Sequence, residues 1–268
     1  MLSREDFAYK HYPILDTEGK RRITINHLLR MSSGLDWIEE YSINFFKLYK
    51  GKLLDSNVVE MLYMEEDMGG YSAQQKLVRK PDEQFYYSSG TSNILMSLLK
   101  AKLGKDSYEA LPWKHLFTPL GMSNVTWEQD RAGTFVGSSY LYMKPRDLAK
   151  VGLLYLNNGI WKGERLLPKD WVEYTTTAAP SFAKTKLKGF ANRENYGAHW
   201  WLNKNNQEKG LARPYPDAPE SLYMALGHYG QSLAIFPEQN MLVVRTAYDQ
   251  DDGIDRNTLY KLILASLK

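Results

Sequence analysis

The sequence predicts an α+β fold, in which a mainly helical region comes first and an antiparallel sheet with a terminal helix follows. Apolar residues recur at helical spacing over about residues 23–180. Short apolar runs separated by turn residues fill about residues 195–268. Helices and strands that are segregated along the chain are typical of α+β architecture. A length of 268 residues allows one large domain or two small ones, and of these we expect a single domain over residues 1–268.

The first helices are predicted from their caps. Thr24 is expected to cap a helix over residues 25–31 that ends at Ser33-Gly34. Thr91 is expected to open a stronger helix, which ends at Gly104. Its apolar stripe consists of Ile94, Leu95, Leu98 and Leu99.

Further helices follow from acidic caps and from prolines. Asp55 and Asp106 are each expected to cap one. Pro145 is suited to the first position of a helix that Gly159 ends, and Pro168 predicts a short helix through Trp171.

The last third of the chain predicts strands. They are expected at residues 197–202, 221–226, 231–236 and 241–247. The turn residues Pro237–Asn240 predict an antiparallel hairpin between the last two. The continuous apolar run at 241–244 indicates a strand covered on both faces, and the spacing of Leu259, Leu262, Ile263 and Leu267 predicts a terminal helix.

Charge and cysteine content exclude several classes of protein. The 34 Lys and Arg residues nearly balance 31 Asp and Glu residues, so nothing favours a nucleic-acid partner. The absence of Cys excludes disulfides and thiolate sites. No apolar run has the length of a membrane span, and the N-terminus does not resemble a signal peptide. As written, the chain is expected in the cytoplasm; an upstream segment carrying a signal would instead make it periplasmic or exported.

Among the five histidines, only His228 lies in a suggestive setting. The others, His11, His27, His115 and His199, lack partners at metal-ligand spacing, so we expect no metal and no cofactor. His228 lies at the mouth of a predicted strand, beside Gly230, where a substrate could approach closely. From spacing alone, a turn histidine is an equally good interpretation.

Tyr87-Ser88-Ser89 lies just before the predicted helix at Thr91. The two serines and the tyrosine could form only a helix cap and a packed aromatic. A tyrosine can also act as a general base where nearby cations stabilise the phenolate. The aromatic stretch at 37–49 is expected to be a packed or solvated loop. A loop that gates a substrate is the weaker interpretation.

Five segments carry a resemblance in the order in which they occur. They are residues 23–35, Phe85-Tyr86-Tyr87-Ser88-Ser89-Gly90, Pro119-Leu120-Gly121-Met122, residues 146–159 and Gly227-His228-Tyr229-Gly230-Gln231. Together they resemble the serine β-lactamase and penicillin-binding-protein superfamily, above all its class C β-lactamase-like branch, which includes esterases and nylon-oligomer hydrolases. The resemblance implies a β-lactamase/transpeptidase-like fold, with an antiparallel sheet flanked by helices and a separate helical region.

In this family the nucleophile is the Ser of a Ser-x-x-Lys motif, which lies upstream of the segment at 23–35. The residues before Ile23 contain no such motif, so the N-terminal part of the fold is expected to be missing. The Ser-x-x-Lys strings at Ser97 and Ser181 lie in the wrong places and are interpreted as coincidence. A missing buried helix would leave a large cavity, so another segment or a partner is expected to complete the fold.

The resemblance implies acyl transfer. Tyr87 would handle protons with the missing Lys, and the backbone N–H of Gln231 would form half of an oxyanion hole. His228 would orient the substrate or tune Tyr87. Ser89, Tyr229 and Gly230 would contact the substrate.

Two departures bear on the substrate. Ser89 replaces the Asn of the lactamases' Tyr-x-Asn motif, and His228-Tyr229-Gly230 replaces Lys-Thr-Gly. Both favour a small ester or amide over a β-lactam. The first hypothesis is therefore a serine hydrolase of small esters or amides, shortened and inactive as given. The alternative is a non-catalytic binding protein, a pseudoenzyme that retains the cleft.

Overall fold

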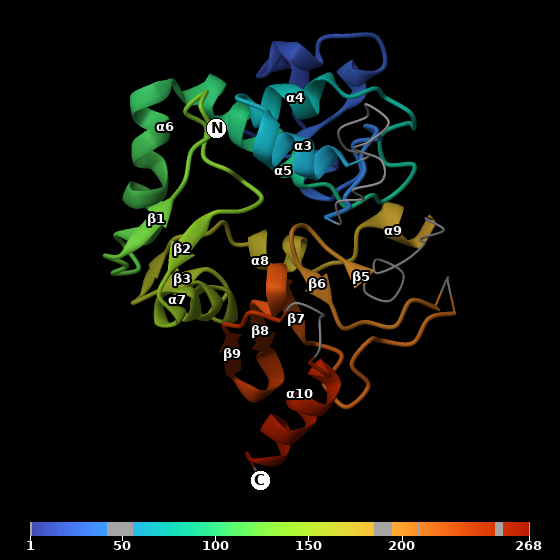
Figure 1. Cartoon of the computed structure of the whole chain (residues 1–268). Coiled ribbons are helices and arrows are strands. Elements are labelled where there is room, and N and C mark those ends of the chain that lie inside the picture. Colours follow the sequence, from blue (N-terminus) through green and yellow to red (C-terminus); the bar gives the residue numbers. More distant parts are fainter. Residues whose placement is uncertain (1, 42–55, 185–194, 208–209, 250–253, 268) are drawn as a thin grey trace. The chain divides into compact units, whose positions relative to one another are not determined.

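The computed structural model describes residues 2–41, 56–184, 195–207, 210–249 and 254–267. The chain divides into two compact units (Figure 1). The first comprises Met1–Pro112 with Val125–Tyr142, and the second comprises Trp113–Asn124 with Met143–Lys268. The expectation of one domain remains a prediction. Asp55 and residues 42–49 of the expected loop lie outside the described residues.

The first unit is mainly helical. Its helices are α1 (Ile25–Leu29), α3 (Asn57–Met64), α4 (Met68–Gln74), α5 (Ser89–Leu103) and α6 (Lys105–Pro112), preceded by 3-10 turns at Ala8–Lys10, Pro13–Leu15 and Lys20–Arg22. A two-stranded sheet, β1 (Val125–Trp127) with β2 (Leu141–Met143), accompanies them.

Local caps explain where these helices begin. The Thr24 hydroxyl accepts the His27 amide and the His27 ring accepts the Thr24 amide, which confirms the predicted cap of α1. The cap of α3 is Ser56, whose hydroxyl accepts the Val59 amide. The expected start of α5 at Thr91 was wrong, because Ser88 caps that helix and its first residue is Ser89, two residues before Thr91. Gly104, with φ of 75°, ends it as expected.

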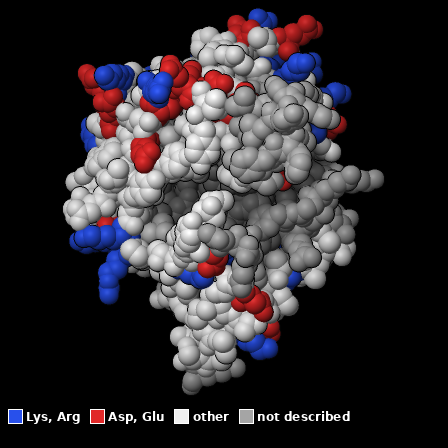
Figure 2. Space-filling model, in the orientation of Figure 1, with Lys and Arg blue, Asp and Glu red and all other residues white. Residues whose placement is uncertain are grey.

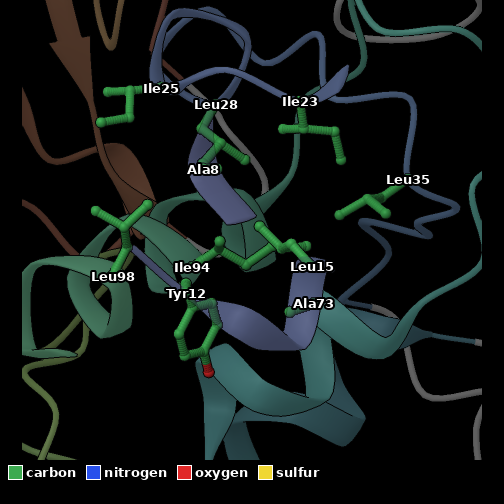
Figure 3. Close-up of a cluster of buried hydrophobic side chains, with 10 residues drawn as sticks. All are labelled: Ala8, Tyr12, Leu15, Ile23, Ile25, Leu28, Leu35, Ala73, Ile94 and Leu98. Carbon is green, nitrogen blue, oxygen red and sulfur yellow. The ribbon is translucent and has the colours of Figure 1, made fainter. Parts of the chain in front are cut away.

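The core of the first unit lies between α1, α4 and α5 (Figure 3). Ile94 and Leu98 of α5 point into a cluster with Ile25 and Leu28 of α1. All four side chains are at most 7% exposed. The predicted apolar stripe of α5 therefore packs against α1, which fixes the helix that follows Tyr87.

The second unit contains the main sheet. Its elements are a π-helical turn (Trp113–Phe117), α7 (Pro145–Leu156), β3 (Ile160–Trp161), β4 (Glu164–Arg165), α8 (Trp171–Thr175), α9 (Pro180–Lys184), β5 (Asn195–Tyr196), β6 (Trp201–Leu202), β7 (Tyr223–Leu226), β8 (Ser232–Phe236), β9 (Met241–Arg245) and α10 (Arg256–Ala265). Pro145 opens α7 as predicted. The helix expected at Pro168 instead begins at Trp171.

The sheet is antiparallel, in the order β5-β6-β7-β8-β9. The predicted hairpin joins β8 to β9 through Pro237–Gln239, with Phe236 opposite Met241. The expectation of a strand at 241–244 covered on both faces holds in part, because no side chain of β9 is either exposed or fully buried. Within the described residues β9 is the edge strand, and all five of its side chains are half-buried.

The strand expected at 197–202 is wrong, because two short strands and a turn occupy this region. Asn195–Tyr196 pairs with Trp201–Leu202, and the Gly197 amide donates to the Trp200 carbonyl. His199 closes the turn with φ of 61°, which a continuous strand does not allow. A Cβ on Gly197 would lie 2.0 Å from the Thr175 carbonyl oxygen, so this position requires glycine.

Surface properties agree with the balanced composition. Figure 2 shows basic and acidic side chains interspersed on the face drawn. Among the described residues, no helix is long and apolar enough to cross a membrane. The same residues contain no group of three or more His, Asp or Glu side chains that could hold a metal ion.

Candidate functional site

The Tyr87 motif lies in the first unit, directly before α5. Phe85 is fully buried, and the Tyr86 amide donates to the Met31 carbonyl, so the approach to the helix is anchored on both sides. Tyr87 is half-buried. Burial, and secondly the negative charge of Glu39, raise the pKa of Tyr87 to about 12. Near neutral pH its phenol is therefore protonated and can donate a proton.

Ser89 is the first residue of α5, and its side chain is only 4% exposed. Its amide donates to Oε2 of Glu39 at 2.9 Å, and its hydroxyl donates to Oε1 of the same carboxylate at 2.5 Å. Both polar groups of Ser89 are thus engaged by Glu39. The expected contact between Ser89 and a substrate remains a prediction.

Trp37 completes this arrangement. Its indole nitrogen donates to Oε2 of Glu39 at 2.5 Å, and the side chain is 3% exposed. A Cβ on Gly90 would lie 2.5 Å from the Trp37 ring, so only glycine permits this approach. The sequence predicts a loop at Trp37, and Glu39 was not among the predicted site residues. The nearest signal was the Trp-x-Glu spacing within that aromatic stretch.

The second motif lies in the second unit, as the turn between β7 and β8. His228–Gly230 forms a 3-10 turn in which Tyr229 has φ of 54° and ψ of 34°, a left-handed conformation unusual for a residue with a side chain. The ring centroids of His228 and Tyr229 are 3.9 Å apart, and those of Tyr229 and Tyr248 are 4.8 Å apart. Tyr248 is 70% exposed, so the row of rings opens to solvent.

The end of β9 and the residues after it hold this turn in place. The side-chain NH₂ of Gln231 donates to the backbone carbonyl of Ala247. The side-chain oxygen of Gln231 accepts the backbone amide of Ala247 at 3.3 Å. Arg245 donates to the Gly230 carbonyl at 2.8 Å and forms an ion pair with Asp249 at 2.8 Å. This ion pair lowers the pKa of Asp249, chiefly through the hydrogen bond from Arg245.

Glycine is required at position 230, where φ is 82° and a Cβ would lie 2.5 Å from a carboxylate oxygen of Asp249. The space beside Gly230 is therefore filled by Arg245 and Asp249. The backbone N–H of Gln231, the expected oxyanion donor, makes a long 3.4 Å turn bond to the His228 carbonyl. So long a bond competes only weakly for this donor.

The two stray Ser-x-x-Lys strings occupy packed positions. Ser97 lies on α5, where its hydroxyl fills the space beside Gly69 of α4; a Cβ on Gly69 would lie 2.0 Å from it. Ser181 is fully buried in α9. Both positions agree with packing rather than with an accessible nucleophile.

The structure brings the predicted site residues together in two groups. Tyr87 and Ser89 lie side by side at the start of α5, whereas His228, Tyr229, Gly230 and Gln231 form one turn of the second unit. Four residues that were not predicted as site residues support them: Trp37, Glu39, Arg245 and Asp249.

The comparison with known protein families covers nearly the whole chain. The sequence profile of the family described as Beta-lactamase matches residues 6–266. The chain belongs to the β-lactamase family. This confirms the resemblance seen in the sequence and the β-lactamase/transpeptidase-like α+β fold.

Two proteins similar to this chain are described as hydrolases. A 6-aminohexanoate-dimer hydrolase of Paenarthrobacter ureafaciens is 25% identical over 166 residues, which are 60% of this chain and 38% of that protein. The structure of a putative 6-aminohexanoate-dimer hydrolase from Bacillus anthracis superposes with a TM-score of 0.74 at 19% identity, over 99% of this chain and 66% of that one. The chain thus spans about two fifths and two thirds of their respective lengths.

Two other similar structures are a class C β-lactamase, with a TM-score of 0.60 at 16% identity, and EstCE1, a hydrolase with promiscuous acyltransferase activity, with a TM-score of 0.64 at 15% identity. The alignments cover all of this chain and 76% and 78% of those chains. At such low identity these structures show the fold alone.

Proposed function

We propose that this protein contributes to a serine hydrolase of small esters or amides. The observation that carries the proposal is Tyr87, a half-buried phenol held protonated at the entrance of α5 in a chain that the family profile matches almost throughout. The family supports acyl-transfer chemistry, and the Paenarthrobacter relative is a hydrolase of an amino-acid dimer by name. Ser89 and His228-Tyr229-Gly230 favour ester or amide substrates over β-lactams.

The proposed reaction has two steps. A serine hydroxyl attacks the carbonyl carbon, its proton passes by way of Tyr87 to the leaving alcohol or amine, and an acyl-enzyme forms as the carbonyl–heteroatom bond breaks. Water then adds to the acyl-enzyme and releases the acid, and its proton returns to the serine. Burial and Glu39 keep the phenol of Tyr87 protonated near neutral pH, so it can pass its proton to the leaving group as it accepts the proton of the serine.

We assign the turn at 228–231 to the carbonyl and to the substrate body. Release of the 3.4 Å bond would free the Gln231 N–H to donate to the developing oxyanion. His228 would orient the substrate or tune Tyr87. Tyr229 would offer a ring face, and Gly230 would shape the turn beside it.

The nucleophile is proposed to come from a Ser-x-x-Lys motif outside these 268 residues. Such a segment, or a partner, would also complete the fold. The edge of β9 is a suitable place for this segment to bind. The side chains of β9 are half-buried, and among the described strands β9 pairs only with β8. A strand edge of this kind accepts a further strand through its backbone groups.

A labelling experiment tests the proposal. A fluorophosphonate probe should label the native gene product that extends upstream of Met1, and Tyr87→Phe should slow that labelling. The 268-residue chain alone should stay unlabelled. Labelling of the short chain that is lost on changing Ser97 or Ser181 would contradict the assignment of the nucleophile.

The pseudoenzyme alternative makes a different prediction. It is favoured if the coding sequence upstream of Met1 contains no in-frame Ser-x-x-Lys and the native product is never labelled. The intact mass of the native product shows which N-terminus is used.

A further inference from the structure

Four hydrogen-bond donors converge on the carboxylate of Glu39. Oε2 accepts the Ser89 amide at 2.9 Å and the Trp37 indole at 2.5 Å. Oε1 accepts the Ser89 hydroxyl at 2.5 Å and the Tyr41 hydroxyl at 2.9 Å. A carboxylate has about four acceptor sites, so all of them are used. Among the described residues, Glu39 forms no salt bridge, and these neutral donors hold its charge in place.

This carboxylate lies at the start of a helix of 15 residues. The first amides of a helix lack partners within it, and negative charge is favourable there. Ser88 already caps α5 by accepting the Thr91 amide. Glu39 takes the Ser89 amide in addition, from 50 positions earlier in the sequence. The start of α5 is therefore tied to a distant segment as well as capped locally.

The contact between Trp37 and Gly90 fixes the distance between the two segments. The Trp37 ring lies where a side chain at position 90 would be, so its indole nitrogen reaches Glu39 only because residue 90 is glycine. Tyr87 is two residues before Ser89. Any displacement of Glu39 would therefore alter both the first turn of α5 and the electrostatic surroundings of Tyr87.

We propose that Glu39 is a positioning residue for Tyr87. The role of Ser89 is then to bind Glu39 rather than to contact the substrate. This inference deepens the proposed function, since it assigns the supports of the proposed proton donor. It also gives a reason for serine at the third position of the motif. Serine presents an N–H and an O–H to the same carboxylate, and both bonds are formed here.

The test uses the native gene product and needs no turnover. Carbon-13 labelled tyrosine is titrated by NMR, and the Tyr87 signal is assigned with Tyr87→Phe. In Glu39→Gln the pKa of Tyr87 should fall below that of the unaltered chain, because the negative charge that helps burial raise it is gone. Tyr41, whose pKa burial and Glu39 also raise, should shift in the same direction.

Glu60→Gln is the matched control. Glu60 is a half-buried carboxylate that accepts the Tyr71 hydroxyl at 2.8 Å. Burial and Glu60 raise the pKa of Tyr71, to about 12, while the hydrogen bond from Asn57 opposes them. This substitution should lower the pKa of Tyr71 and leave that of Tyr87 unchanged. A substitution that only destabilises the fold would alter the unfolding free energy without this selectivity.

Amide hydrogen exchange supplies a second measurement. The Ser89 amide should exchange faster in Glu39→Gln, because a Gln amide group cannot accept all the donors that the carboxylate accepts. Ser89→Ala removes one donor and keeps the charge, so it should not lower the pKa of Tyr87. If Glu39→Gln does not fold, Glu39→Asp serves instead, because it keeps the charge but shortens the side chain; unchanged exchange of the Ser89 amide in that variant would overturn the proposal.

Tyr87 titration and Ser89 exchange that are both unchanged in Glu39→Gln would likewise overturn it. The outcome is independent of the labelling experiment. Changes in both measurements without any labelling of the native product would leave Glu39 as a positioning residue of a non-catalytic protein. Labelling without these changes would refute the role of Glu39 alone.

Discussion

The turn between β5 and β6 holds His199 in a half-buried position with a φ of 61°. Burial lowers the pKa of His199 from its ordinary value of 6.5 to about 4. In the unfolded chain this histidine takes up a proton near its ordinary value, whereas in the folded chain it resists protonation. The stabilising contribution is therefore fully present above pH 6.5 and is lost as the pH falls through about 4.

The size of the effect follows from the difference between the two values. One pH unit corresponds to about 1.4 kcal/mol, so a difference of about 2.5 units corresponds to at most about 3.5 kcal/mol of unfolding free energy. Asn is a suitable replacement because it adopts left-handed φ values readily. His199→Asn should therefore retain the turn while removing this part of the acid sensitivity.

Urea unfolding followed by tryptophan fluorescence at several pH values measures the effect. Between neutral pH and about pH 4, the unaltered chain should lose more unfolding free energy than His199→Asn, by up to about 3 kcal/mol. His115→Asn is the control, since His115 is exposed. Parallel pH profiles for the unaltered chain and His199→Asn would refute the reasoning, whatever their absolute stabilities.

Three further predictions concern tyrosines and close-packed glycines. Burial raises the pKa values of Tyr12, Tyr71, Tyr87 and Tyr140 to about 12. The free energy of unfolding should therefore fall as the pH rises from 10 to 12, while tyrosinate absorbance increases. Unfolding that is complete below pH 10 would contradict this. Gly90→Ala should cost roughly 1–3 kcal/mol in urea unfolding, because its methyl group would collide with Trp37, and unaltered stability would show that the ring can move. Gly230→Ala should also cost roughly 1–3 kcal/mol, because its methyl group would collide with the Asp249 carboxylate. The loss of unfolding free energy should be smaller in an Asp249→Ala background, and equal losses would exclude the collision with Asp249 as a cause.

Features that depend on neighbouring residues in the sequence could be predicted. Thr24 caps α1, Pro145 opens α7 and Gly104 ends α5, because each effect acts within one helical turn. The hairpin at Pro237–Gln239 was predicted for the same reason. The motif at Tyr87 was also found, since its residues are contiguous.

Features that depend on distant residues could not be predicted. The contact of Glu39 with Ser89 joins positions 50 residues apart, and nothing local marks it. The strand expected at 197–202 failed because its apolar composition fits a strand, whereas the close approach of Gly197 to Thr175 imposes a turn. The position of β9 at the edge follows from the order of the strands, which the apolar run at 241–244 does not encode.

The position of β9 at the edge of the sheet, among the strands that the structure describes, affects how the chain behaves in solution. An apolar strand edge without proline offers a template for the same strand of another molecule. In Met241–Arg245 only the last residue is charged, so little opposes such pairing. The isolated chain should therefore form oligomers as its concentration rises, and light scattering over a dilution series should show this. Capping the edge with charge, as in Val243→Lys, should extend the range in which it stays monomeric.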